Sequence, residues 1–261
     1  MGVLNAKLKL EVKNICKIMD GKDILKSVSF NVHDGEFLSF LGPSGCGKTT
    51  ILKILTGLID ATEGQVYKDG KEITSMAPAH RGMGIVFQNY ALFENMTVLE
   101  NVNYALKFHK EWKTAEAERA LEMIELVGLR GYVNKKPGQL SGGQQQRVAI
   151  ARTLALNPDI ILFDEPMSAL DIDTRLALRG EIKELQRKLG TTIIFVTHDQ
   201  EEAFAMSDRI MVMNEGRVCQ IGTPHDILKN PADDFVTKFV KENLKLKMDS
   251  MYKYLGNIYE K

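Results

Sequence analysis

Residues 42–49 are Gly42-Pro43-Ser44-Gly45-Cys46-Gly47-Lys48-Thr49, which match the pattern G-x-x-x-x-G-K-[ST] in full. A short apolar run at 37–41 precedes them and has the composition of a buried parallel strand. A helix is predicted to follow from Lys48 to about Leu58, ended by Gly57 or by the turn at 60–64. A strand, a glycine-rich turn and a helix in this order predict a phosphate-binding loop in an α/β fold.

The predicted loop offers positive charge and backbone N–H groups to a phosphate. Glycines let the backbone wrap an anion, and the helix N-terminus adds about half a positive charge. Lys48 adds a full charge for the β- and γ-phosphates, and Thr49 offers a hydroxyl oxygen to Mg²⁺. All eight residues are therefore candidate nucleotide ligands. The alternative, a glycine-rich turn that happens to contain a lysine, is disfavoured by the strand and helix on either side.

A second apolar strand ends in two carboxylates. Ile160-Ile161-Leu162-Phe163 leads directly into Asp164 and Glu165. Paired carboxylates at the end of a buried strand are costly unless a positive group meets them. We expect Asp164 to hold Mg²⁺ and Glu165 to orient or deprotonate an attacking water. The alternative is a solvated strand end or a helix cap.

Leu140-Ser141-Gly142-Gly143-Gln144 is a third candidate site and lies directly before a predicted helix. Two adjacent glycines at a helix start expose N–H groups to an anion. Taken alone, the stretch could be a plain serine N-cap. Its place in the chain, between the phosphate loop and the acidic strand, favours a role in nucleotide binding.

The remaining pattern predicts a parallel α/β core with two additions. Apolar and charged residues alternate over 7–13, which predicts a half-buried strand with Lys9 on its polar face. Asp69-Gly70 marks a hairpin. The pattern becomes helical over 89–156, which predicts an inserted helical lobe. Two apolar strands with a helix between them, over 160–196, indicate a parallel βαβ unit.

Composition excludes several classes of protein. Lys plus Arg and Asp plus Glu both number 34, so the basic excess of a phosphate-gripping nucleic-acid binder is missing. The three cysteines, Cys16, Cys46 and Cys219, form no CxxC pair, which favours reduced thiols over a zinc or redox motif. No uncharged apolar run approaches the roughly 18 residues that span a bilayer. We expect a cytosolic chain whose membrane role, if any, depends on a partner.

The order of six motifs resembles the ATP-binding subunits of the ABC transporter family over about 8–240. The motifs are the Walker A loop (42–49), the Q-loop glutamine Gln88, the signature motif (140–144, continued by Gln145-Gln146-Arg147), Walker B (160–165), the D-loop (168–171) and the switch histidine His198. The resemblance implies a P-loop NTPase core with a mostly parallel sheet, an N-terminal antiparallel β part and a helical subdomain inserted at about 89–156. It implies a cassette at 4–240 and a short tail at 241–261 without a regulatory domain.

The resemblance also implies roles for individual residues. Two copies would pack head to tail, with each ATP between the Walker A loop of one copy and Ser141, Gly143 and Gln144 of the other. Gln88 would contact Mg²⁺ and the attacking water, and His198 would bind the γ-phosphate. Thr50 would contact the α-phosphate, and Asp171 would lie at the nucleotide interface. For His198 and Asp171 the alternative is a helix cap.

One position departs from the family. ABC ATPases usually stack adenine on an aromatic side chain, and ungapped alignment from the Walker A loop puts Met19 at that position. A thioether contacts a ring more weakly than an aromatic side chain does. We therefore hypothesise relaxed base selectivity, with GTP supporting turnover comparably to ATP.

The stretch 88–98 resembles importer ATPases of the iron, polyamine, oxyanion, phosphonate and sugar group. In that group this region receives a short helix of the membrane subunit, which implies a docking groove near Tyr90, Leu92, Phe93 and Met96. Core packing is the alternative for each of them. The implied protein is a peripheral ATPase on the cytoplasmic face of the cell membrane, with permease subunits and a separate solute-binding protein as partners and no nucleic acid. The competing functions are an exporter ATPase and a non-transport ABC protein that acts on DNA or ribosomes.

Overall fold

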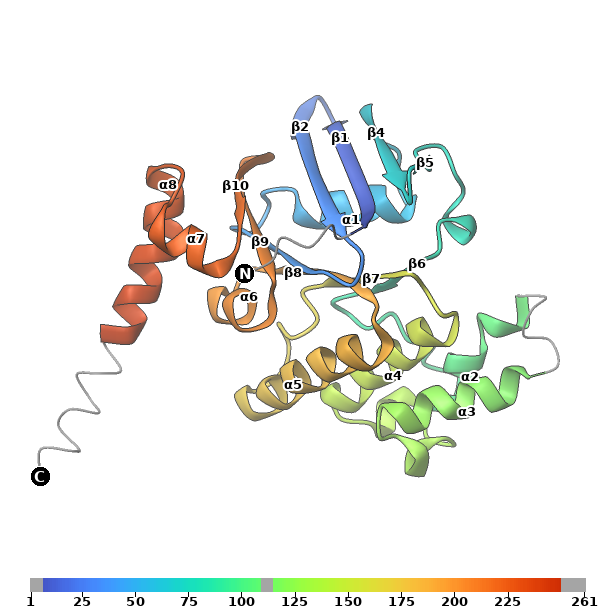
Figure 1. Ribbon diagram of the computed structural model, residues 1–261. Coiled ribbons are helices and arrows are strands. Elements are labelled where there is room, and N and C mark those ends of the chain that lie inside the picture. The colour runs from blue at the N-terminus through green and yellow to red at the C-terminus, as the bar shows by residue number, and fades with distance from the viewer. Residues whose placement is uncertain (1–6, 109–114, 250–261) are drawn as a thin grey trace, which may run out of the picture.

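The computed structural model describes residues 7–108 and 115–249, which form two sheets flanked by helices (Figure 1). The larger sheet is parallel except for the edge strand β10, which runs antiparallel to β9. Its strands in spatial order are β10 (Arg217–Gly222), β9 (Arg209–Asn214), β3 (Phe37–Leu41), β8 (Thr192–Thr197), β7 (Ile160–Asp164) and β6 (Met83–Val86). The predicted α/β fold with a mostly parallel sheet is confirmed.

The second sheet is antiparallel and comes from the N-terminal part of the chain. Its strands in spatial order are β2 (Lys22–His33), β1 (Leu8–Met19), β4 (Glu63–Lys68) and β5 (Lys71–Glu72). The predicted hairpin at Asp69-Gly70 joins β4 to β5, and both turn residues have positive φ, 50° and 77°. Positive φ at both central positions is what a tight hairpin of this twist requires.

Helices cover both faces of the larger sheet. Helix α1 (Lys48–Thr56) lies on the side of the antiparallel sheet (Figure 1). The other face is covered by α2 (Val98–Asn103), α3 (Glu116–Leu126), α4 (Gly142–Ala155) and α5 (Ile172–Leu189). Beside β9 and β10 lie α6 (Gln200–Met206), α7 (Pro224–Lys229) and α8 (Asp234–Val236), which continues as a π-helix over Thr237–Glu242.

Because successive strand residues point to opposite faces, each face of the larger sheet has its own apolar core. Phe163 and Phe195 pack against the helices α2, α3, α4 and α5. Their neighbours Leu162 and Ile194 pack with α1 and the antiparallel sheet. A strand that is buried on both faces must be apolar throughout, which explains the continuous apolar runs in the sequence.

The helical lobe begins later than expected. Helix is predicted from residue 89, but the first helix starts at Val98, behind a Thr97 N-cap and a capping box with Glu100. Tyr90 and Ala91 have φ of 60° and 47°, a left-handed pair that no α-helix contains. The lobe otherwise ends at Ala155, close to the expected position, and its residues 109–114 lie outside the described part of the chain.

Lys9 was expected on the polar face of the first strand, and this expectation is wrong. Its side chain is buried, because Asp69, Asp159 and Asp34 lie 3.1, 3.6 and 3.9 Å from its Nζ. Burial opposes the charged form of Lys9, but the hydrogen bond to Asp69 and the three carboxylates outweigh burial and raise its pKa above the usual value. The lysine thereby joins the antiparallel sheet to the segment that enters β7.

The C-terminal part of the described chain is helical through Asp249, and Lys247 forms a 3.1 Å ion pair with Glu201 of α6. The last part of the expected tail, 250–261, lies outside the described residues. Within the described ranges, no helix combines the length and apolar composition that crossing a bilayer requires.

Candidate functional site

The phosphate loop joins β3 to α1, and two of its glycines are required by close contacts. A Cβ on Gly42 would lie 2.4 Å from the Met213 carbonyl oxygen. A Cβ on Gly47, which has φ of 104°, would lie 2.6 Å from a methyl carbon of Leu25. The loop is therefore wedged between β9 and β2 with no room for side chains at these two positions.

Lys48 is buried at the start of α1 and faces back into the loop. Its Nζ donates to the carbonyl oxygens of Gly42 and Pro43, at 2.7 and 2.9 Å. The N-cap of α1, Gly47, makes no side-chain cap, and the first turn contains no acidic residue. The first N–H groups of α1 and the lysine charge therefore form a positive site at this helix start.

Thr49 and Asp164 meet at the carboxyl ends of β3 and β7. The Thr49 hydroxyl donates to Asp164 Oδ1 at 2.7 Å. Burial raises the pKa of the Asp164 carboxyl, and Glu165 acts in the same direction, while the Thr49 hydrogen bond, Lys53 and Lys48 oppose the rise. A buried carboxylate beside a hydroxyl is the oxygen donor set that Mg²⁺ prefers.

The described residues contain no group of three or more His, Cys, Asp or Glu side chains that could hold a metal ion alone. A magnesium ion here would need hydroxyl and phosphate oxygens beside the Asp164 carboxylate. The paired oxygens of Thr49 and Asp164 fit such a mixed site, since Mg²⁺ is commonly held by one or two carboxylates together with substrate phosphates.

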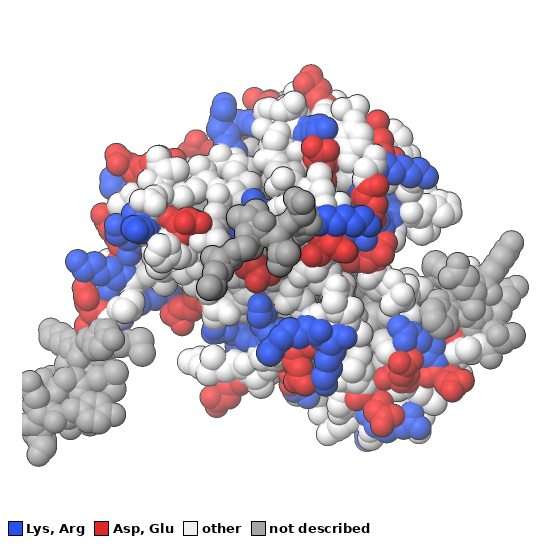
Figure 2. Space-filling view, viewed as in Figure 1, with Lys and Arg blue, Asp and Glu red and all other residues white. Residues whose placement is uncertain are grey.

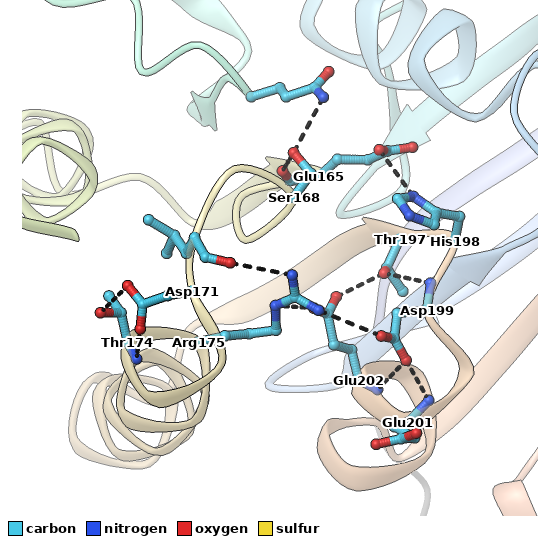
Figure 3. Close-up of polar contacts among 12 residues, drawn as sticks. Glu165, Ser168, Asp171, Thr174, Arg175, Thr197, His198, Asp199, Glu201 and Glu202 are labelled. Atoms are coloured by element: carbon cyan, nitrogen blue, oxygen red, sulfur yellow. Dashed lines mark hydrogen bonds and ion pairs between the residues drawn. The ribbon is translucent and has the colours of Figure 1, made fainter. Parts of the chain in front are cut away.

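Glu165 and His198 lie side by side, as Figure 3 shows. Strand register explains why, because Asp164 of β7 pairs with Val196 of β8, two residues before His198. Glu165 has φ of 46°, and its N–H donates to the Val196 carbonyl at 3.1 Å. Its Oε2 lies 3.0 Å from Nδ1 of His198. The left-handed backbone at Glu165 turns its side chain toward the histidine.

Gln88 reaches the same group through Ser168. The Gln88 side-chain amide donates to Ser168 Oγ at 3.1 Å, and that hydroxyl donates to the Glu165 carbonyl at 3.0 Å (Figure 3). The predicted catalytic residues Gln88, Glu165 and His198 are thus brought together. The sequence assigned no role to Ser168 itself, and only its place in the 168–171 motif could have indicated one.

Ser141 and Gly143 stand at the start of α4, on the opposite side of the larger sheet from α1 (Figure 1). Ser141 is the N-cap and forms a capping box with Gln144, whose N–H donates to Ser141 Oγ at 3.3 Å. The hydroxyl accepts in this bond, so its own proton remains available to a ligand. No hydrogen bond between described residues joins this segment to the phosphate loop of the same chain.

The remaining predicted nucleotide ligands are less closely connected. Asp171 is the N-cap of α5 and accepts from the N–H and hydroxyl of Thr174, at 2.9 and 2.8 Å. The helix-cap interpretation of this residue therefore describes its contacts within one chain. Thr50 lies half-buried in the first turn of α1. Met19 ends β1 and is 44% exposed, so its side chain is available to a ligand.

A groove of about 360 Å³ lies between β6, the segment after it and α4. Of the four predicted docking residues only Phe93 lines it, while Tyr90 and Leu92 pack against the lobe core and Met96 is half-buried. Tyr104 and Arg152 also line the groove but were missed in the sequence. The Tyr104 ring lies 4.4 Å from that of Phe93.

Arg152 explains the left-handed pair that precedes Phe93. Its guanidinium donates to the carbonyls of Ala91 and Tyr90, at 2.6 and 3.0 Å, and lies 5.8 Å from the Phe93 ring. Burial lowers the pKa of Arg152. A charged residue within the apolar stripe of the helix over 142–155 was the available sequence signal.

The phosphate loop after β3 and the acidic end of β7 define a P-loop nucleotide-binding protein. The family model described as "ABC transporter" matches residues 25–168. A spermidine/putrescine import ATP-binding protein of Oleidesulfovibrio alaskensis is 50% identical over 230 residues, which are 88% of this chain and 62% of that protein. An Fe(3+) ions import ATP-binding protein of Rhizobium meliloti is 51% identical over 218 residues, 84% of this chain and 55% of that protein.

Among solved structures, a dimeric ATP-binding cassette in a post-hydrolysis state bound to ADP and Pi is 38% identical, with a TM-score of 0.72. The match covers 82% of this chain and 98% of that chain. The chain therefore belongs to the ABC transporter family, and the predicted P-loop NTPase fold is confirmed. The chain spans 62% and 55% of the length of the two relatives named above.

Proposed function

We propose that the chain is the ATP-hydrolysing subunit of an ABC importer and works as a homodimer. One observation carries the proposal: parallel strands bring Lys48, Thr49, Asp164, Glu165 and His198 to one edge of the larger sheet. Ligands of open α/β sheets bind at the carboxyl ends of the strands, which is where these residues lie. The relatives with import functions support the direction of transport.

Nucleotide binding would replace the hydrogen-bond partners of Lys48 in the phosphate loop. Lys48 would turn from the carbonyls of Gly42 and Pro43 to the β- and γ-phosphates, which also receive the N–H groups at the start of α1. Mg²⁺ would be held by Thr49 and Asp164, with Gln88 as a further oxygen ligand, and would neutralise charge on the phosphates. The bond to Ser168 uses the amide nitrogen of Gln88, so its Oε1 is available for that role.

Glu165 would orient or deprotonate the attacking water, and His198 would contact the γ-phosphate. The 3.0 Å contact with Nδ1 of His198 fixes one oxygen of Glu165, which leaves the other free to face the water. Glu165 extends from the left-handed position after β7, and His198 directly follows the end of β8. Strand register and the bond from the Glu165 N–H to the Val196 carbonyl bring both side chains to the same end of the sheet.

A second copy would complete the site with Ser141, Gly143 and Gln144. Ser141 and Gly142 are exposed at the start of α4, where the Ser141 hydroxyl and the first N–H groups of the helix can donate to a phosphate. ATP would be shared between two copies, so binding stabilises the dimer and hydrolysis weakens it. The dimeric cassette among the solved neighbours supports this arrangement.

The direct test is phosphate release by the purified chain with ATP and Mg²⁺. Chelating the Mg²⁺ with EDTA is expected to stop turnover. Hydrolysis that continues at the same rate without divalent cations would contradict the roles of Thr49 and Asp164.

The groove lined by Phe93 is proposed to receive a short helix of a permease subunit, which would place the chain at the cytoplasmic face of the membrane. A separate solute-binding protein would be the third component. Basic and acidic side chains are interspersed on the face shown in Figure 2, which fits a protein partner better than nucleic acid.

Tyr104→Ala is expected to weaken permease association by roughly 30-fold, since a truncated interface aromatic commonly costs about 2 kcal/mol. Tyr104 lines the groove and is 36% exposed, while Tyr132 lies outside it and is 37% exposed. Tyr132→Ala is the matched control. The amount of permease that co-purifies with each variant from solubilised membranes measures the effect. Equal recovery with both variants would count against this groove.

Met19 is expected to give relaxed base selectivity, with kcat/KM for GTP within about threefold of that for ATP. Met19→Tyr should tighten nucleotide binding, because stacking of a base on an aromatic ring contributes about 1–3 kcal/mol. The neighbouring residue Ile18 is 49% exposed, so Ile18→Tyr serves as the control. Competition between the two nucleotides measures selectivity, and a strong preference of the unaltered chain for ATP would refute the hypothesis.

A further inference from the structure

Polar contacts and the chain itself together form a ring around a cavity of about 40 Å³ beside Glu165 and His198. Figure 3 shows the contacts. The cavity is lined by Glu165, Ser168, Arg175, Thr197, His198, Asp199 and Glu202. Three segments meet here: the turn after β7, the first turn of α5, and the junction of β8 with α6. Only Glu165, Ser168 and His198 belong to the hydrolytic group described above.

Arg175 closes this ring from the first turn of α5. Its Nη2 donates to the Leu170 carbonyl at 3.2 Å, and its Nη1 lies 3.7 Å from Asp199 Oδ2. Its Nε is buried, lies 3.8 Å from Glu202 Oε1 and has no hydrogen-bond partner within the described ranges. The guanidinium thus holds one carbonyl directly and two carboxylates by charge across slightly longer distances.

Glu202 is the buried carboxylate that faces the Arg175 guanidinium. Its side chain is only 6% exposed, and burial raises the pKa of its carboxyl, while the Thr197 hydrogen bond and Arg175 act in the opposite direction. Glu202 Oε2 accepts from the Thr197 hydroxyl at 2.6 Å. A buried carboxylate is costly without a counter-charge, and Arg175 supplies it.

The residues before and after His198 in the chain, Thr197 and Asp199, take part in the same contacts. The Thr197 hydroxyl, which donates to Glu202, accepts from the N–H of Asp199 at 2.9 Å. The Asp199 side chain caps α6 by accepting from the N–H groups of Glu201 and Glu202. The residues immediately before and after His198 are therefore tied to the carboxylates that face Arg175.

The other half of the ring leads from Arg175 to Glu165. Leu170, whose carbonyl Arg175 holds, belongs to the turn in which the Ser168 hydroxyl donates to the Glu165 carbonyl. Glu165 then meets His198. A displacement of Arg175 would alter the position of Glu165 and that of His198 together.

We propose that Arg175 is a positioning residue for hydrolysis, which holds the turn carrying Glu165 and the segment carrying His198 at the separation that lets the two side chains meet. The role rests on the proposed ATPase function. In this role Arg175 acts through Glu165 and His198 and not through a contact of its own with the nucleotide. Loss of Arg175 lowers kcat and leaves nucleotide binding unchanged.

The test compares Arg175→Met with Arg209→Met. Arg209 pairs with Glu36 at the end of the strands opposite to the proposed site. The side chains of Arg209 and Glu36 are 26% and 6% exposed, and those of Arg175 and Glu202 are 30% and 6% exposed. Both variants leave a buried glutamate without its arginine, so both should lose thermal stability. We expect kcat to fall about tenfold or more in Arg175→Met only, with KM for ATP within twofold. Equal kcat values in the two variants would overturn the proposal.

Arg175→Met/Glu202→Gln separates positioning from stability. The second substitution removes the unpaired carboxylate, so melting temperature is expected to recover while kcat stays low. Recovery of kcat together with stability would show a merely structural role and overturn the proposal. Should Arg175→Met not fold, Arg175→Lys and Arg209→Lys are compared in the same way.

A readout that needs no turnover keeps this proposal distinct from the proposed function. The ¹⁵N resonance of His198 Nδ1, assigned with His198→Gln, is expected to move in Arg175→Met toward its position in Glu165→Ala. It should stay in place in Arg209→Met. If the His198 Nδ1 resonance does not move in Arg175→Met, the positioning role is refuted even if the chain hydrolyses ATP. A chain that hydrolyses no ATP but shows the shift refutes the ATPase proposal, while the placement of Glu165 against His198 by Arg175 is still supported.

Discussion

Glu165→Gln is expected to bind ATP with unchanged affinity and to hydrolyse it at least about a hundredfold more slowly than the unaltered chain. The amide matches the size of the carboxylate and can still meet His198 Nδ1, but it cannot accept a proton from water. Because ATP remains intact between two copies, the variant should accumulate as a dimer. Phosphate release measures the first effect, and size-exclusion chromatography with ATP measures the second.

The control for this variant is Glu215→Gln. Glu215 also has a left-handed backbone, with φ of 45°, but it lies in the exposed turn between β9 and β10. It should hydrolyse ATP normally and form no ATP-stable dimer. Near-normal turnover in Glu165→Gln would remove Glu165 from its assigned role.

Lys48→Ala is expected to lose nucleotide affinity by roughly a hundredfold or more, which corresponds to about 3 kcal/mol. The lysine is the only full positive charge within 42–49, and its hydrogen bonds to phosphate would be charge-assisted in a buried setting. Titration with a fluorescent ATP analogue gives the dissociation constant.

Lys53→Ala tests whether a general positive field would suffice. Lys53 lies on the same helix, five residues after Lys48, and is exposed. Its loss should change affinity by no more than about threefold, as expected for a solvent-screened charge. Unchanged ATP binding in Lys48→Ala would contradict the phosphate-loop assignment.

Local patterns predicted the parts of the fold that depend on local physics. The strand at 37–41, the helix that ends at Gly57 and the hairpin at Asp69-Gly70 follow from apolar runs and from glycine conformations. The phosphate loop was found for the same reason, since its ligands are consecutive in the sequence.

Features that depend on distant contacts could not be predicted in this way. Lys9 is buried because Asp159, 150 positions later, lies beside it. Tyr90 and Ala91 form a left-handed pair whose carbonyls both accept from Arg152 of α4. Ser168 and Arg175 join Glu165 to His198 through contacts that no periodicity encodes. The individual roles of Gln88, Ser141 and Asp171 stay predictions.

The hydrogen bonds of Lys48 to Gly42 and Pro43 have a kinetic consequence. A loop that is already shaped by its own lysine loses little conformational entropy when a triphosphate enters, because one set of acceptors simply replaces another. Capture by a single copy should therefore be fast and show only a small heat-capacity change. The slow events of the proposed hydrolytic cycle would then be the association and dissociation of the two copies.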